Sequence, residues 1–158
     1  MSENKQLESD LILHWIIVIM MLSMLIAYNI ICHLMGSEIQ VNIDEDQRIL
    51  IRTVFYIIAI ILFPMVSLIR HILLRLNQTM PGDLPAKNRY LTTIIITLVL
   101  VEAVGVFGFV MFVLGDGFNT LYIFSTLGAL GIYLHRPKQD EYGGIIEALR
   151  VQHLTRKP

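Results

Sequence analysis

Residues 91–114 read LTTIIITLVLVEAVGVFGFVMFVL, and Glu102 is the only charged residue in this run. About 20 apolar residues are enough to cross a bilayer as a helix, so the run predicts a transmembrane helix with Glu102 near its middle. An ionised side chain at that depth costs at least ~2.5–3.5 kcal/mol on insertion scales. We therefore expect either a neutral carboxylic acid or a bound cation at this position.

Three further apolar stretches, residues 11–35, 53–69 and 118–135, predict three more membrane helices. The chain is 55% hydrophobic and 16% charged, whereas a soluble domain carries about 25% charged residues. The predicted fold is all-α: an integral membrane four-helix bundle of two antiparallel hairpins, formed by residues 1–137. Its helices are expected at about 10–35, 48–76, 87–115 and 118–135.

Local signals predict where these helices begin and end. Asp10 is the expected N-cap of the first helix, and Gly36 is its expected stop signal. Residues 80–85 (MPGDLP) predict a break before the third helix, and Gly115 begins a Gly-Asp-Gly turn that predicts a close hairpin between the third and fourth.

The tail, residues 138–158, carries apolar side chains at helical spacing. This spacing is typical of an amphipathic helix, which we expect to lie on the cytoplasmic surface of the membrane. The residues that define its apolar face are Tyr142, Ile145, Ile146 and Leu149.

The basic residues predict the orientation in the membrane. Of the 12 lysines and arginines, all but Arg48 and Arg52 lie before the first apolar stretch, between the second and third, or after the fourth. The positive-inside rule then places both termini in the cytoplasm. We expect a multi-pass protein of the inner (plasma) membrane, with the lipid bilayer as its first partner.

Several polar groups share the approximate depth of Glu102. Pro64 has no backbone N–H, so it leaves the carbonyl of Ile60 without its helical donor. No lysine or arginine lies at this depth, so a neutral, hydrogen-bonded Glu102 or a bound cation is expected. The candidate proton- or cation-binding group comprises Glu102, Ser23, Ile60, Ser125 and Thr126.

Small residues near Glu102 predict a helix-packing seam, because they let membrane helices approach closely. The seam lies either within the bundle or between subunits. Its expected members are Ala103, Gly105 and Gly108 in the third apolar stretch, Gly128 and Gly131 in the fourth, and Pro64 in the second.

Residues 101–108 (VEAVGVFG) resemble the carboxylate-bearing helix of the c-type proteolipids that form the rotor rings of F- and V-type ATPases. In that family a membrane Glu or Asp binds a proton or a sodium ion. The resemblance implies that proton or cation binding at Glu102 is chemically reasonable. It covers about eight residues and assigns no family, and the first two apolar stretches lack the glycines of that family's helices. As a whole, the chain resembles a small bacterial inner-membrane protein.

Three histidines, His14, His71 and His135, fall near the cytoplasmic boundary. Two of them on facing helices would satisfy the axial ligation of a haem, although their spacing matches no metal motif. Cys32 is the only cysteine, so CxxC chemistry is excluded. No nucleophile elbow, HExxH or Walker loop is present, so we expect no enzyme, cofactor or metal centre, and no nucleic-acid partner.

Two main classes of function compete. The first is a non-enzymatic accessory or scaffold subunit that packs with itself or with other membrane subunits, with Glu102 as a buried hydrogen-bonding group. The alternative is a proton- or cation-coupled transport component that titrates at Glu102. A haem- or quinone-binding membrane anchor is the third reading.

Overall fold

The computed structural model describes the backbone of residues 2–80 and 84–155. Residues 81–83 of the expected break and 156–158 of the expected tail lie outside the described residues. The described chain is all-α, as predicted. Its helices are α1 (Ser2–Ile39), α2 (Glu45–Thr79), α3 (Ala86–Val113), α4 (Phe118–Leu134) and α5 (Gln139–Thr155). Three of them are long and apolar enough to cross a membrane, namely α1, α2 and α3, and α4 is a shorter apolar helix of 17 residues.

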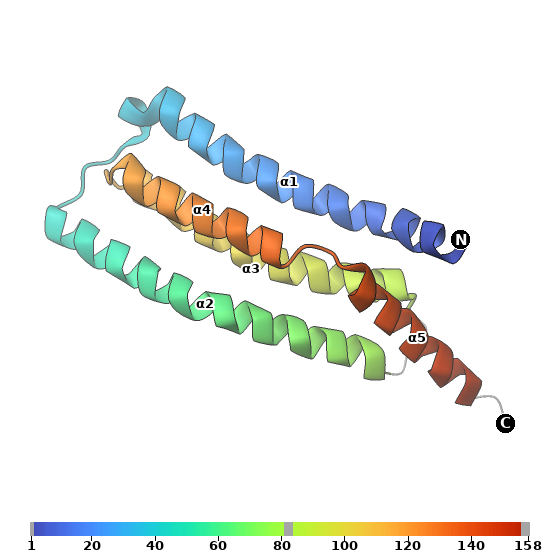
Figure 1. The fold of residues 1–158 in the computed structure, drawn as a ribbon. Helices are drawn as coiled ribbons and strands as arrows, with labels where there is room; N and C mark the ends of the chain where they lie inside the picture. Colours follow the sequence, from blue (N-terminus) through green and yellow to red (C-terminus); the bar gives the residue numbers. More distant parts are fainter. Residues whose placement is uncertain (1, 81–83, 156–158) are drawn as a thin grey trace.

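Helix α3 is the centre of the molecule and packs against α1, α2 and α4. Figure 1 shows α1 and α2 on opposite sides of the α3–α4 pair. In the most apolar segment of α3, half of the residues are buried by protein, whereas the buried share is 22% for α1 and 17% for α2. This burial explains why α3 is apolar on every side, since a helix with no polar face needs neighbours or lipid all around it.

The turn between α3 and α4 is as tight as its glycines predict. Gly115 has a φ of 85°, a conformation that suits a residue without Cβ. The amide of Gly115 donates to the carbonyl of Phe112 (3.0 Å), and that of Asp116 donates to Met111 (3.0 Å). These bonds satisfy carbonyls at the end of α3, so the chain reverses at once into α4.

The expected pairing of the first two helices into a second packed hairpin is not what the structure shows. Residues 40–44 pass over the α3–α4 turn instead, and the amide of Val41 donates to the carbonyl of Val113 (2.7 Å). Arg48 donates to the carbonyl of Gly115 (3.1 Å), and Arg52 pairs with Asp116 (3.3 Å). Because the connection is anchored on the turn, α1 and α2 descend on different sides of α3.

Helix α1 continues through both of its expected ends. Asp10 lies inside the helix, where it accepts a hydrogen bond from Tyr142 (3.1 Å). Gly36 also lies inside the helix, and its lack of a side chain leaves room for Phe112, since a Cβ there would sit 3.0 Å from Cζ of that ring. The buried residues of α1 recur every seventh position, a narrow contact stripe. They are Leu11, Val18, Leu25 and Cys32, with His14 among them.

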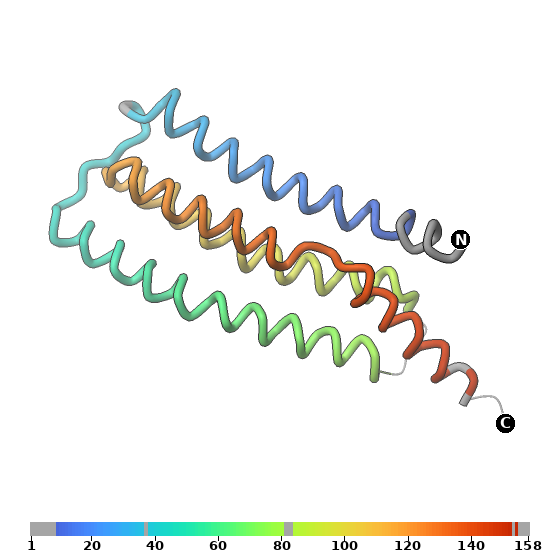
Figure 2. Tube along the Cα trace, viewed as in Figure 1, coloured from blue at the N-terminus to red at the C-terminus, as the bar shows by residue number. Residues whose placement is uncertain are grey.

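Helix α5 lies at the end of the molecule where α2 ends and α3 begins (Figure 2), and it contacts α1, α2 and α3. Two residues of its expected apolar face, Tyr142 and Ile145, are 2% and 0% exposed, so they pack on the chain's own helices. Ile146 and Leu149 are half-buried against the same core. The chain itself therefore covers much of the surface that was expected to face lipid headgroups.

Candidate functional site

Glu102 lies on α3 at the floor of a groove between α1 and α3, which we call the Glu102 groove. The groove has a volume of about 380 Å³. Glu102 is 7% exposed, and neither carboxyl oxygen has a hydrogen-bond partner among the described residues. The other lining residues are all apolar: Met21, Met24, Val99, Ala103, Val106 and Phe107. An unpaired buried polar group costs about 1–3 kcal/mol, so the burial of this carboxyl without a partner destabilises the fold.

The structure does not bring the other expected midplane groups to Glu102. Ser23 is exposed on α1 and donates to the carbonyl of Ile19 in its own helix (2.8 Å). Ile60 is 72% exposed on α2, and no residue of α2 lines the Glu102 groove. Pro64 is exposed on α2 as well, away from a close helix contact. Residues at the same depth on neighbouring helices therefore do not all lie on faces that meet.

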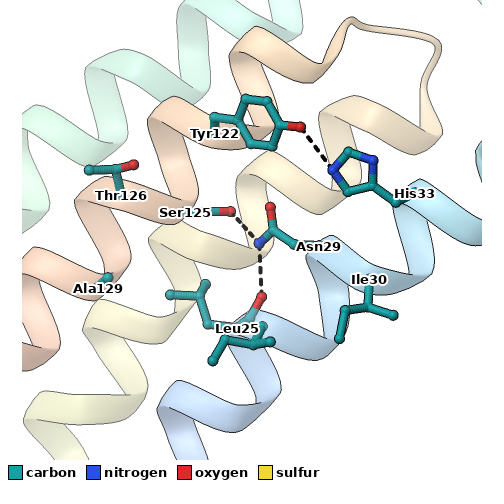
Figure 3. A pocket seen from close by; sticks show the side chains of 9 residues that line it. Leu25, Asn29, Ile30, His33, Tyr122, Ser125, Thr126 and Ala129 are labelled. Carbon is teal, nitrogen blue, oxygen red and sulfur yellow. Dashed lines mark hydrogen bonds between the residues drawn. The ribbon is translucent and has the colours of Figure 1, made fainter.

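Ser125 and Thr126 line a different groove, between α1 and α4 (Figure 3). The amide of Asn29, on α1, donates to Ser125 Oγ (2.9 Å) and to the carbonyl of Leu25 (2.9 Å). Asn29 was missed by sequence reasoning. Its signal was an amide inside an uncharged apolar run, which is rare on a lipid-facing helix and tends to mark an interhelical contact.

The glycine seam lies between α3 and α4. A Cβ at Gly128 would sit 3.2 Å from both Cα and N of Gly105, so the two backbones touch at this point. A Cβ at Gly108 would sit 2.8 Å from Cβ of Phe124. Gly131 similarly leaves room for Val101 of α3. The seam thus packs within the chain, whereas Ala103 faces the Glu102 groove.

A polar network at the other end of the bundle was also missed. Arg70 of α2 is 6% exposed, and its Nη2 and Nε donate to the carboxylate of Glu141 of α5 (2.6 and 3.3 Å). Its Nη1 donates to the carbonyl of His135 (2.7 Å) and to Thr97 (3.3 Å), and its Nη2 donates to the carbonyl of Arg136 (3.1 Å). One guanidinium therefore joins α2, α3, α5 and the segment after α4.

Tyrosines complete this network. The hydroxyl of Tyr90 donates to Glu141 (3.0 Å) and accepts the amide of Lys138 (2.8 Å). Burial, together with the hydrogen bond to Asp10, raises the pKa of Tyr142 to about 12, so this phenol stays protonated. Burial also lowers the pKa of His135, whose ring contacts the carbonyl of Gly131 (2.9 Å). Buried rings and the Arg70–Glu141 ion pair, with a longer contact between Lys138 and Glu141 (3.9 Å), thus hold α5 in place.

The three histidines considered as haem ligands have separate surroundings. His14 is buried, and its ring centroid lies 5.2 Å from Tyr90 and 6.3 Å from Tyr142. His71 is exposed on α2, and Nε2 of His135 lies 3.4 Å from Ser67 Oγ. Among the described residues, no three His, Cys, Asp or Glu side chains form a group that would hold a metal ion.

The described residues thus form an all-helical protein with membrane-length helices, and among them the acid of the central helix has no hydrogen-bond partner. No protein-family model, curated protein or solved structure matches the chain.

Proposed function

We propose that this chain is a non-enzymatic accessory subunit of the inner membrane, crossing it four times with α1–α4 and keeping both termini in the cytoplasm. The 17 residues of α4 extend about 25 Å at 1.5 Å per residue, which suits the lower limit of a membrane span. The distribution of lysine and arginine supports the orientation. Helix α5 then caps the cytoplasmic ends of the bundle.

The unpaired carboxyl of Glu102 carries the proposal. The group is buried in apolar surroundings, yet it lines a groove that opens sideways between α1 and α3. In hydrocarbon such a group is neutral at lowest cost, and a neutral acid both donates and accepts a hydrogen bond. The occupant that satisfies it is a transmembrane helix of another subunit that presents an amide or hydroxyl side chain. Polar side chains join membrane helices in this way.

Cation transport has less support, because a hard cation requires several oxygen ligands. Among the described residues that line the Glu102 groove, the carboxyl of Glu102 is the sole side chain with oxygen. A proton relay equally needs a chain of titratable or hydroxyl groups, and the lining residues supply none beyond Glu102.

The test compares Glu102→Gln with Glu102→Leu. The amide keeps a hydrogen-bonding group in the groove, whereas leucine removes it. We expect Glu102→Leu to weaken assembly about 3- to 30-fold, as the loss of about 0.6–2 kcal/mol implies, and Glu102→Gln to retain most of it. The measurement is the mass of the complex extracted from native membranes in mild detergent, over a dilution series.

The matched control is Ser23→Leu, which removes an exposed hydroxyl of α1 that bonds only to its own helix. It should leave the mass of the complex unchanged. The proposal fails if Glu102→Leu assembles like the wild type. Faster proton or sodium flux through wild-type proteoliposomes than through Glu102→Gln proteoliposomes would favour transport instead.

A further inference from the structure

A second groove lies between α1 and α4, on the other flank of α1 (Figure 3). Its volume is about 480 Å³, within the range of small-molecule sites. We call it the Asn29 groove. Leu25, Ile30 and Ala129 contribute its apolar surface. Its polar side chains are Asn29, His33, Tyr122, Ser125 and Thr126.

The polar groups of the Asn29 groove retain unused hydrogen-bonding capacity. Both amide hydrogens of Asn29 are donated, one to Leu25 and one to Ser125, so its Oδ1 remains an acceptor. Among the described residues, no donor reaches that oxygen, and neither the Ser125 nor the Thr126 hydroxyl donates to a protein acceptor. The groove therefore offers one acceptor and two donors to a ligand.

These groups lie within the hydrocarbon depth. Asn29 is about seven residues from the middle of the apolar part of α1, Ser9–Gly36, which amounts to roughly 10 Å along the helix. The hydrocarbon core extends roughly 15 Å from its centre. Water is absent there, so unused polar groups carry a free-energy cost that a polar ligand would remove.

Charge selects the ligand class. No Asp, Glu, Lys or Arg of the described chain lines the Asn29 groove. The basic side chains of Arg48 and Arg52 already bond to Gly115 and Asp116 at the α3–α4 turn. A phosphate or ammonium headgroup would find no counter-charge, so the groove favours a neutral head that carries both a hydrogen-bond donor and an acceptor.

Aromatic rings at one end of the groove favour a planar head. The ring of His33 stacks on Phe118, with centroids 4.6 Å apart and planes inclined by 14°. Tyr122 lies beside His33 (5.9 Å between centroids) and its hydroxyl contacts Nε2 (2.8 Å). Such a surface accepts a further ring in offset or tilted contact.

We propose that the Asn29 groove binds a prenylated quinol. One ring hydroxyl donates to Asn29 Oδ1, and a ring oxygen accepts from Ser125 or Thr126. The isoprenoid chain follows the apolar wall of α1 and α4 into the bilayer. The site is distinct from the Glu102 groove, because the two grooves share no lining residue.

The experiment measures binding of decylubiquinol to the purified full chain in detergent, by native mass spectrometry and by the shift of the unfolding temperature. Expected is one quinol per chain. Decylubiquinone, which lacks the hydroxyl donor, should bind about 3- to 10-fold more weakly. Dioctanoylglycerol (a hydroxyl and ester carbonyls without a ring) and phosphatidylglycerol should each bind at least about tenfold more weakly.

Variants locate the site. Asn29→Leu should weaken quinol binding about tenfold or more, and Thr126→Val about 3- to 10-fold. Thr126 makes no hydrogen bond to the described chain, so its replacement leaves the helix contacts intact. Ser23→Ala and Glu102→Leu should bind quinol like the wild type. Equal binding of dioctanoylglycerol and quinol, or wild-type affinity in both groove variants, would overturn the proposal.

Discussion

Replacement of Arg70 by alanine is expected to lower the free energy of unfolding by about 3–5 kcal/mol, because it removes the buried partner of Glu141 and leaves that carboxylate only the longer ionic contact with Lys138 (3.9 Å). Arg70 is 6% exposed and donates to Glu141 and to the carbonyls of His135 and Arg136. Helix α5 should detach from the bundle. The measurements are denaturant titration in mixed micelles and the rate of tryptic cleavage after Lys138 and within α5.

Arg75→Ala is the control, since Arg75 is an exposed arginine of the same helix. It should change the free energy of unfolding by no more than about 0.5 kcal/mol. The double variant Arg70→Met with Glu141→Leu should be more stable than Arg70→Ala, because it leaves no buried charge behind. If Arg70→Ala behaves like Arg75→Ala, the network does not hold α5.

The second large effect on the free energy of unfolding is expected when a methyl group is added at Gly108. In Gly108→Ala the new Cβ would sit 2.8 Å from Cβ of Phe124 and 3.0 Å from the carbonyl oxygen of Leu121. Neither neighbour is the free end of a flexible side chain, so α4 must move away from α3. We expect a loss of about 1–3 kcal/mol in the free energy of unfolding, measured by the same titration.

Gly143→Ala provides the matched control, because a Cβ at Gly143 would have no neighbour within 4 Å. Gly143 lies inside α5, where alanine is the better helix former by about 0.5–1 kcal/mol. The same chemical change should therefore stabilise one helix and destabilise another. Equal effects at the two positions would contradict the close α3–α4 contact.

The helices could be predicted from the sequence because their lengths follow from bilayer thickness. The tight turn at Gly115 could be predicted for a similar reason, since its signal is local. The faces on which the helices meet could not be predicted from the sequence. Counting residues from the helix ends gave Ser23 the depth of Glu102 but left its direction around the helix undetermined, and Ser23 points outward.

Long-range polar pairing escaped sequence reasoning for a related reason. In the sequence Arg70 is one of several basic residues that predict the orientation, and its partner Glu141 is 71 positions away. Nothing in the local pattern around either residue joins them. The apolar spacing of Tyr142 and Ile145 did predict helix α5, but the same spacing suits a lipid surface and a protein surface equally.

The central claim is that Glu102 serves as a neutral hydrogen-bonding acid within the membrane. Infrared spectroscopy of the assembled protein at neutral pH tests it most directly, as the difference between wild type and Glu102→Gln. The account predicts the carbonyl band of a protonated, hydrogen-bonded carboxylic acid in the wild type and its absence in Glu102→Gln. Ionised carboxylate bands that disappear in Glu102→Gln would contradict it.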